Sequence, residues 1–131
     1  MTVLCLAVAA VIRVALPVTE FTLAWTHSVE RIRWEEDYRV DGDMLSAVTA
    51  RVRGSGAGME PPAGAELRNG VWHYRPNVPP LRRLRLTVSP YAADYELCWK
   101  GHCTRLTDLV AMPEGGGVVE ASACPDARVR D

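Results

Sequence analysis

The stretch Trp34-Glu-Glu-Asp-Tyr-Arg-Val-Asp-Gly-Asp-Met-Leu-Ser-Ala-Val-Thr-Ala-Arg-Val-Arg53 decides the fold class of this 131-residue chain. Up to Val40 two sets of side chains alternate, which is typical of a β-strand with two different faces. One set is Trp34, Glu36, Tyr38 and Val40, and the other is Glu35, Asp37 and Arg39. Asp41-Gly42 is a hairpin-turn dipeptide. The strand that returns over residues 44–53 is predicted to place on one side Met44, Ser46, Val48, Ala50 and Val52.

The same alternation continues on both sides of this hairpin. Residues 21–29 place on one face Phe21, Leu23, Trp25, His27 and Val29. Further short strands are predicted at 71–74, 81–88, 95–99 and 103–106. About eight or nine short strands, without an apolar stripe at helical spacing, predict an all-β, single-domain antiparallel sandwich or small barrel. We expect this domain to span residues 1–124, followed by a charged C-terminal tail at 125–131, with disorder as one interpretation of the tail.

Charge and hydropathy restrict the partner and the compartment. Fifteen basic and sixteen acidic residues leave a net charge of −1, which argues against a nucleic-acid-binding domain. The apolar run at residues 3–16 is shorter than the roughly 20 residues of a membrane-spanning helix. It also lacks the basic residues that precede the apolar part of a secretory signal. Its β-branched residues favour a buried strand.

Four cysteines raise the question of disulfides. If Lys100-Gly101 forms a two-residue turn, Cys98 lies opposite Cys103 with Cα atoms about 4.5 Å apart, at the short end of disulfide geometry. The sequence favours a disulfide there, and Cys5 and Cys124 are candidates for a second. Four reduced cysteines in a cytoplasmic protein are the alternative. The sequence around His102 lacks the second ligand pair of a zinc site, so we expect no metal and no cofactor.

Several polar residues are candidates for chemistry. His27 and Ser28 are adjacent in a predicted strand and point to opposite faces, so His27 is poorly placed to activate Ser28. A small hydrolase or metal-dependent enzyme would therefore need His27 together with His73 and Glu36. The alternative is that His27 belongs to a buried polar network. The acidic residues Glu30, Glu35, Glu36 and Asp37 lack calcium-loop spacing, and a solvated hairpin tip is favoured over a cation site or a basic partner surface.

A glycine-rich loop follows the hairpin. Gly54, Gly56 and Gly58 permit positive φ and can aim backbone N–H groups at an anion, but no phosphate-loop lysine follows. The alternative is a bulged crossover that needs glycine for close packing. Met59, Glu60 and the prolines after them give the loop the character of a shaped surface. Trp25, Trp34 and Trp72 are candidates for a shared apolar floor, either as core or as a stacking surface.

The chain resembles the uncharacterised bacterial and archaeal family called domain of unknown function 1850. The resemblance rests on Phe21-Thr-Leu-Ala-Trp-Thr-His-Ser-Val-Glu30, Trp34-Glu-Glu-Asp-Tyr38, Gly54-Ser-Gly-Ala-Gly-Met-Glu-Pro-Pro62, Trp72-His-Tyr74 and the Cys98/Cys103 hairpin. Members of that family are commonly encoded beside TAXI-type TRAP transporters, which pair a periplasmic solute-binding protein with an ion-coupled permease. The resemblance carries over no catalytic residues.

These observations lead to three functional hypotheses. The first is a non-enzymatic accessory or binding protein of a TRAP-type transport system, whose partner is the permease, the solute-binding protein or a small carboxylate. Its expected contact residues are Trp25, His27, Ser28, Glu30, Glu36, Gly54, Gly56, Gly58, Met59 and Glu60. The second is the small enzyme that uses His27, His73 and Glu36. The third is a structural β-domain that pairs with a partner chain through an open strand edge. A periplasmic or membrane-associated location is favoured, with the cytoplasm as the alternative.

Overall fold

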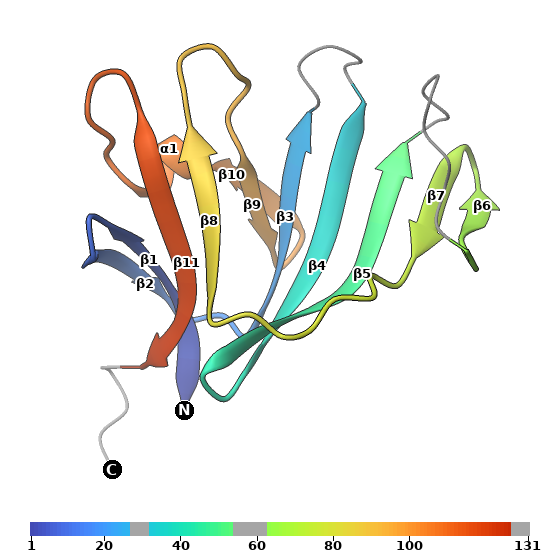
Figure 1. Ribbon diagram of the computed structural model, residues 1–131, viewed down its shortest axis with the longest axis horizontal. Coiled ribbons are helices and arrows are strands. Elements are labelled where there is room, and N and C mark those ends of the chain that lie inside the picture. The colour runs from blue at the N-terminus through green and yellow to red at the C-terminus, as the bar shows by residue number, and fades with distance from the viewer. Residues whose placement is uncertain (27–31, 54–62, 127–131) are drawn as a thin grey trace.

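The chain forms two antiparallel β-sheets that face each other (Figure 1) in the computed structural model, which describes residues 1–26, 32–53 and 63–126. The four-stranded sheet contains, in spatial order, β2 (Val11–Leu16), β1 (Thr2–Val8), β11 (Gly117–Pro125) and β8 (Arg83–Val88). The seven-stranded sheet contains β10 (His102–Arg105), β9 (Glu96–Trp99), β3 (Glu20–Thr26), β4 (Arg33–Asp41), β5 (Met44–Arg53), β7 (Val71–Tyr74) and β6 (Glu66–Arg68). The predicted all-β sandwich is confirmed, with eleven strands in the described residues instead of eight or nine.

One short helix, α1 (Leu106–Leu109), follows β10. Across the described ranges, no helix has the length and hydropathy that a membrane crossing requires.

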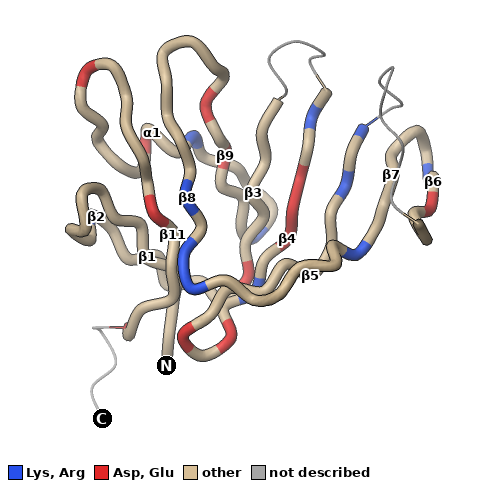
Figure 2. Tube along the Cα trace, viewed as in Figure 1, with Lys and Arg blue, Asp and Glu red and all other residues tan. Residues whose placement is uncertain are grey.

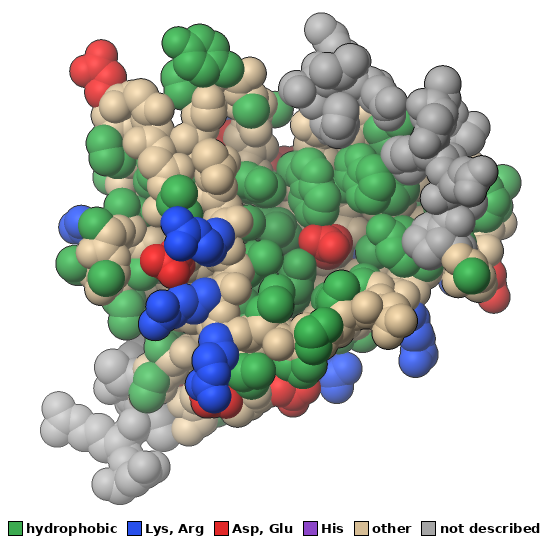
Figure 3. All heavy atoms as spheres, viewed as in Figure 1, with side chains coloured by type: hydrophobic (Ala, Val, Ile, Leu, Met, Phe, Trp, Pro, Cys, Tyr) green, Lys and Arg blue, Asp and Glu red, His purple; other side chains and the backbone are tan. Residues whose placement is uncertain are grey.

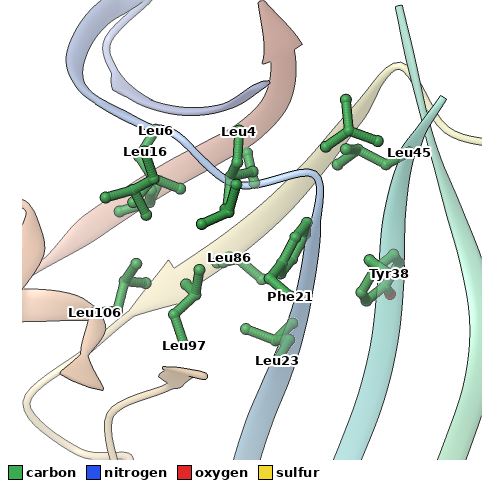
Figure 4. Close-up of a cluster of buried hydrophobic side chains, with 14 of the residues drawn as sticks. Leu4, Leu6, Leu16, Phe21, Leu23, Tyr38, Leu45, Leu86, Leu97 and Leu106 are labelled. Carbon is green, nitrogen blue, oxygen red and sulfur yellow. The ribbon is translucent and has the colours of Figure 1, made fainter. Parts of the chain in front are cut away.

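The hydrophobic core lies between the two sheets. Close-packed apolar side chains there remove nonpolar surface from water and supply the main stabilising free energy. Figure 4 labels ten of them: Leu4, Leu6, Leu16, Phe21, Leu23, Tyr38, Leu45, Leu86, Leu97 and Leu106. Among the described residues, this buried cluster takes no member from β6 or β7. The second sheet therefore covers only part of the seven-stranded sheet.

The central hairpin is present, but its turn lies one residue later than the predicted Asp41-Gly42, and one face assignment is wrong. Asp41 pairs with Met44, so Gly42 and Asp43 form the two-residue turn, and Gly42 has the positive φ of 59° that a type II′ turn needs at this position. The register then shifts, because Tyr38 pairs with Ala47 while Asp37 pairs with Thr49. Val48 is a β-bulge residue, and it reverses the alternation in β5. In consequence Leu45 and Ala47 pack toward the core, and Met44 and Ser46 do not share a face with Ala50 and Val52 as predicted.

The N-terminal apolar run is two strands and not the predicted buried strand. Ala9 and Ala10 both have positive φ, 52° and 63°, and make a tight turn between β1 and β2. β1 lies between β2 and β11 and is buried on both faces, whereas β2 is an edge strand with Val11 52% and Ile12 57% exposed. Sequence hydropathy does not distinguish a central strand from an apolar edge strand, which is why the turn was missed.

Both proposed disulfides are present. Lys100 and Gly101 form the two-residue turn with positive φ at both positions, and Cys98 pairs with Cys103 at a Cα–Cα distance of 4.0 Å. The second disulfide joins Cys5 in β1 to Cys124 in β11, at a sequence separation of 119. The first therefore closes a local hairpin, and the second ties the two ends of the chain together.

Candidate functional site

Three consecutive acidic residues of β4 point to opposite faces of the seven-stranded sheet. Glu36 lies opposite Leu23 and Ala50 in the register. Leu23 belongs to the core, so Glu36 is on the face that turns toward the second sheet, here called the inner face. Glu35 and Asp37 are on the other side, the outer face.

The two outward carboxylates are fully engaged with arginine. Arg51 donates from Nε to Glu35 at 3.0 Å and from both terminal nitrogens to the two oxygens of Asp37, at 2.6 and 2.7 Å. Thr22 also donates to Asp37, at 2.6 Å. Figure 2 shows the acidic part of β4 beside basic positions of β5. Bidentate arginine–carboxylate pairs are among the stronger charged contacts, so this network links β3, β4 and β5.

A second arginine extends the outer network to β9. Arg33 donates to Glu35 at 3.0 Å and to Glu96 at 2.5 Å. In the register Ala24 lies between those two carboxylates, and it is 0% exposed. The Arg33 side chain thus passes over Ala24, whose small side chain leaves room for Arg33 to contact both Glu35 and Glu96.

The network keeps its groups charged. Burial raises the pKa of Asp37 and Glu35, but hydrogen bonds from Arg51, joined by Thr22 at Asp37 and Arg33 at Glu35, outweigh it and place both pKa values below their usual range. The hydrogen bond with Asp37 raises the pKa of Arg51. These residues are held in internal ion pairs, which makes the outer face a poor binding site for an external cation.

Glu36 has a different environment on the inner face. Its carboxylate accepts a hydrogen bond from the Tyr38 hydroxyl at 2.9 Å. Burial and the charge of Glu36 together raise the pKa of three tyrosines, namely Tyr38, Tyr74 and Tyr95. Within the described ranges, no lysine, arginine or histidine forms an ion pair with Glu36. Glu36 therefore lies close to aromatic rings and has no cationic partner among the residues that the structure describes.

Aromatic side chains surround Glu36 on the part of the sheet beyond the core. Trp25 and Trp34 stack across β3 and β4, with ring centroids 6.1 Å apart and ring planes at 8°. Tyr95 is tilted against Trp25 at 6.1 Å. Figure 3 shows hydrophobic side chains gathered over β3, β4, β5 and β7, with an acidic side chain among them.

We name this surface the aromatic face and define it by half-buried residues: Trp25, Trp34, Glu36, Trp72, Tyr74 and Tyr95. Small residues form its base, since Ala50 lies between Glu36 and Tyr74 in the register, and Val52 lies between Trp34 and Trp72. The register places Trp25, Trp34 and Trp72, the candidates for a shared apolar floor, on the same face of the sheet. Tyr74 and Tyr95 were missed, because their segments reach this face only through long-range strand pairing.

The structure separates two of the predicted catalytic residues. His73 pairs with Arg51 on the outer face, whereas Glu36 shares the inner face with Ala50 and Tyr74. The body of the sheet lies between the two side chains, so they do not form one pocket. No group of three or more metal-ligating side chains occurs in the described residues.

The remaining predicted site residues lie outside the described residues. These are His27, Ser28, Glu30, Gly54, Gly56, Gly58, Met59 and Glu60. The same holds for most of the predicted tail, residues 127–131, while β11 runs to Pro125. The anion-nest and polar-network predictions for these segments stay predictions.

A groove of about 650 Å³ lies on the outer face, between the start of β3 and the β9–β10 hairpin. The charged residues along it are Glu20, Asp37, Arg39 and Lys100. Both signs occur, and Asp37 is already paired with Arg51. The groove therefore offers less charge selectivity than the aromatic face.

Comparison of the sequence with protein-family models identifies the family of this chain. A model of the family described as domain of unknown function (DUF1850) matches residues 21–106, and the chain belongs to this family. The match covers β3 to β10 and thus includes all six residues of the aromatic face. No curated protein and no solved structure matches the chain.

Proposed function

We propose that this protein is a non-enzymatic binding protein whose ligand carries a positive charge on an apolar body and binds at the aromatic face. The observation that carries the proposal is Glu36, the acidic residue of β4 that is turned inward and has no cationic partner in the described residues. Its neighbours Glu35 and Asp37 are both paired with Arg51 on the outer face. A partly desolvated carboxylate attracts a cation strongly, and the faces of tryptophan and tyrosine add cation–π attraction.

The expected small carboxylate is disfavoured at this surface by the same charge. Its predicted contacts were the glycine loop at residues 54–62 and the strand edge around His27, and most of these residues lie outside the described residues. At the aromatic face itself a ligand carboxylate would be repelled by Glu36. Charge preference therefore separates the two possibilities in one experiment.

Three probes with the same six-carbon chain test the charge preference: hexylammonium, hexanol and hexanoate. Binding is followed by the fluorescence of the tryptophans, three of which belong to the aromatic face. We expect the wild-type protein to bind hexylammonium at least tenfold more tightly than hexanoate. The variant Glu36→Gln should lose this preference.

The matched control is Glu35→Gln, the same change one position away on the outer face. It removes contacts to Arg33 and Arg51 but leaves the aromatic face intact, so the preference for hexylammonium should remain. A preference that persists in Glu36→Gln, or that disappears in both variants, would show that the ligand does not bind beside Glu36.

The binding role is compatible with a non-enzymatic accessory protein of a TAXI-type TRAP transport system, which we propose from the family resemblance. In that setting the permease or the periplasmic solute-binding protein is the macromolecular partner. Tagged protein purified from native membranes should carry a transporter subunit with it, identified by mass spectrometry. Recovery of no transporter component above an untagged control would remove this assignment and leave the ligand-binding proposal standing.

A further inference from the structure

In the described part of the chain, the two sheets have four edge strands: β2 and β8 in one, β10 and β6 in the other. An edge strand has unpaired backbone N–H and C=O groups along one side, and it can pair with any extended chain unless something prevents this. Charged side chains, short length and β-bulges are usual protections. The four edges differ in how well they are protected against pairing with another strand.

Three of the edges are protected. β8 carries Arg83 and Arg85, both exposed. β10 has only four residues, and one of them, the exposed Arg105, is charged. β6 has three exposed residues, two of which, Glu66 and Arg68, are charged. None of these edges is well suited to pairing with another strand.

β2 has only one charged residue, Arg13, and a bulge at that position, and the rest of the strand is apolar. It has six residues, and five of them are apolar: Val11, Ile12, Val14, Ala15 and Leu16. β-branched residues favour extended backbone and good cross-strand contacts. Val11 and Ile12 leave 52% and 57% of their surface exposed. An incoming strand would cover part of this apolar surface.

Arg13 is the one charged residue of this edge and indicates the partner's charge. It is exposed, and the register shift between β1 and β2 leaves it without a partner residue on β1. It forms no ion pair in the described part of the chain. If two copies paired antiparallel through the middle of β2, their Arg13 side chains would come together, and like charges facing each other are destabilising.

We propose that β2 is a docking edge for an extended segment of another protein, in which apolar residues accompany a carboxylate placed opposite Arg13. The incoming strand would extend the four-stranded sheet by backbone hydrogen bonding, the mode known as β-augmentation. Backbone pairing supplies the affinity, and the Arg13–carboxylate contact sets the register. This surface is separate from the aromatic face.

A pair of capped hexapeptides tests the proposal. Each alternates threonine and valine around one central charged residue, which is glutamate in one peptide and lysine in the other. Binding is measured by NMR titration, with backbone amide exchange locating the contact. We expect the glutamate peptide to bind wild-type protein at least tenfold more tightly than the lysine peptide and to slow exchange of β2 amides.

Charge reversal provides the decisive comparison. Arg13→Glu should reverse the peptide preference, whereas Arg85→Glu on the opposite edge of the same sheet should leave it unchanged. Both residues are exposed, so both variants should fold, which their circular dichroism spectra would test. The proposal is overturned if neither peptide binds at millimolar concentration, if protection appears at another edge, or if sedimentation shows that β2 mediates self-association instead.

Discussion

Two adjacent glycines, Gly115 and Gly116, allow a sharp test of how closely β11 packs against β8. Their φ angles are nearly the same, +89° and +93°. They lie in the turn between α1 and β11, where the Gly116 N–H donates to the Pro113 carbonyl at 3.0 Å. A Cβ atom at Gly115 would have nothing within 4 Å, whereas a Cβ atom at Gly116 would lie 2.0 Å from the Val88 carbonyl oxygen. The same substitution thus has different consequences at neighbouring positions.

The expected losses follow from these geometries. An alanine at positive φ costs roughly 1–2 kcal/mol, partly offset by roughly 0.4–1 kcal/mol because the unfolded chain loses conformational freedom. Gly115→Ala should therefore lower the free energy of unfolding by about 1 kcal/mol. Gly116→Ala must in addition displace the end of β8, and forced overpacking costs roughly 1–3 kcal/mol. We expect a total loss of about 3 kcal/mol at this position.

The measurement is urea denaturation followed by tryptophan fluorescence, with both disulfides kept oxidised. Thermal melts provide a second readout. For a chain of this size 1 kcal/mol corresponds to roughly 4 °C in Tm, so the two variants should differ by about 7–8 °C. Losses that agree within about 0.5 kcal/mol would refute the close approach of Gly116 to Val88, because the backbone contribution is common to both variants.

Three further outcomes are expected. Replacement of Ala9-Ala10 by Asn-Gly should raise the free energy of unfolding by about 1 kcal/mol, because both alanines have positive φ and Asn-Gly is well suited to a turn with two positive φ angles. A thermal melt that shows no gain in Tm would contradict this turn geometry. Arg51→Met should cost about 2 kcal/mol at pH 7 through loss of its bonds to Glu35 and Asp37. The pKa values of both carboxyls are lowered in the folded protein. The ionised carboxylates therefore stabilise the fold at pH values above their ordinary pKa, and this stabilisation disappears as the pH falls. Denaturation at pH 7 and pH 3 should show that the substitution costs less in acid. In the chain-entropy model, the Cys98–Cys103 disulfide closes a short loop and contributes about 2 kcal/mol, whereas the long-loop Cys5–Cys124 disulfide contributes about 5 kcal/mol. Denaturation of the two double serine variants should therefore show the larger loss of unfolding free energy when Cys5 and Cys124 are replaced. Equal losses would count against the model.

Local patterns in the sequence determined a substantial part of the fold. The period-two alternation in residues 34–40 placed Glu36 opposite in direction to Glu35 and Asp37, and the register confirms it. The Lys100-Gly101 turn fixed the Cys98–Cys103 pairing in the same way. Both results depend on neighbouring residues and on turn geometry, so they require no knowledge of the rest of the chain.

Long-range pairing decided the remainder. β11 was not predicted as a strand, yet it lies between β1 and β8 in the centre of the four-stranded sheet. The bulge at Val48 reversed the face of half of β5, because the register depends on both partner strands. Only the assembled sandwich shows that the second sheet stops short of β7, leaving Glu36 among Trp25, Trp34 and Tyr74. Sequence alternation gives the direction of a side chain, but its neighbours come from strands that are distant in the chain, and that is why the aromatic face required the tertiary structure.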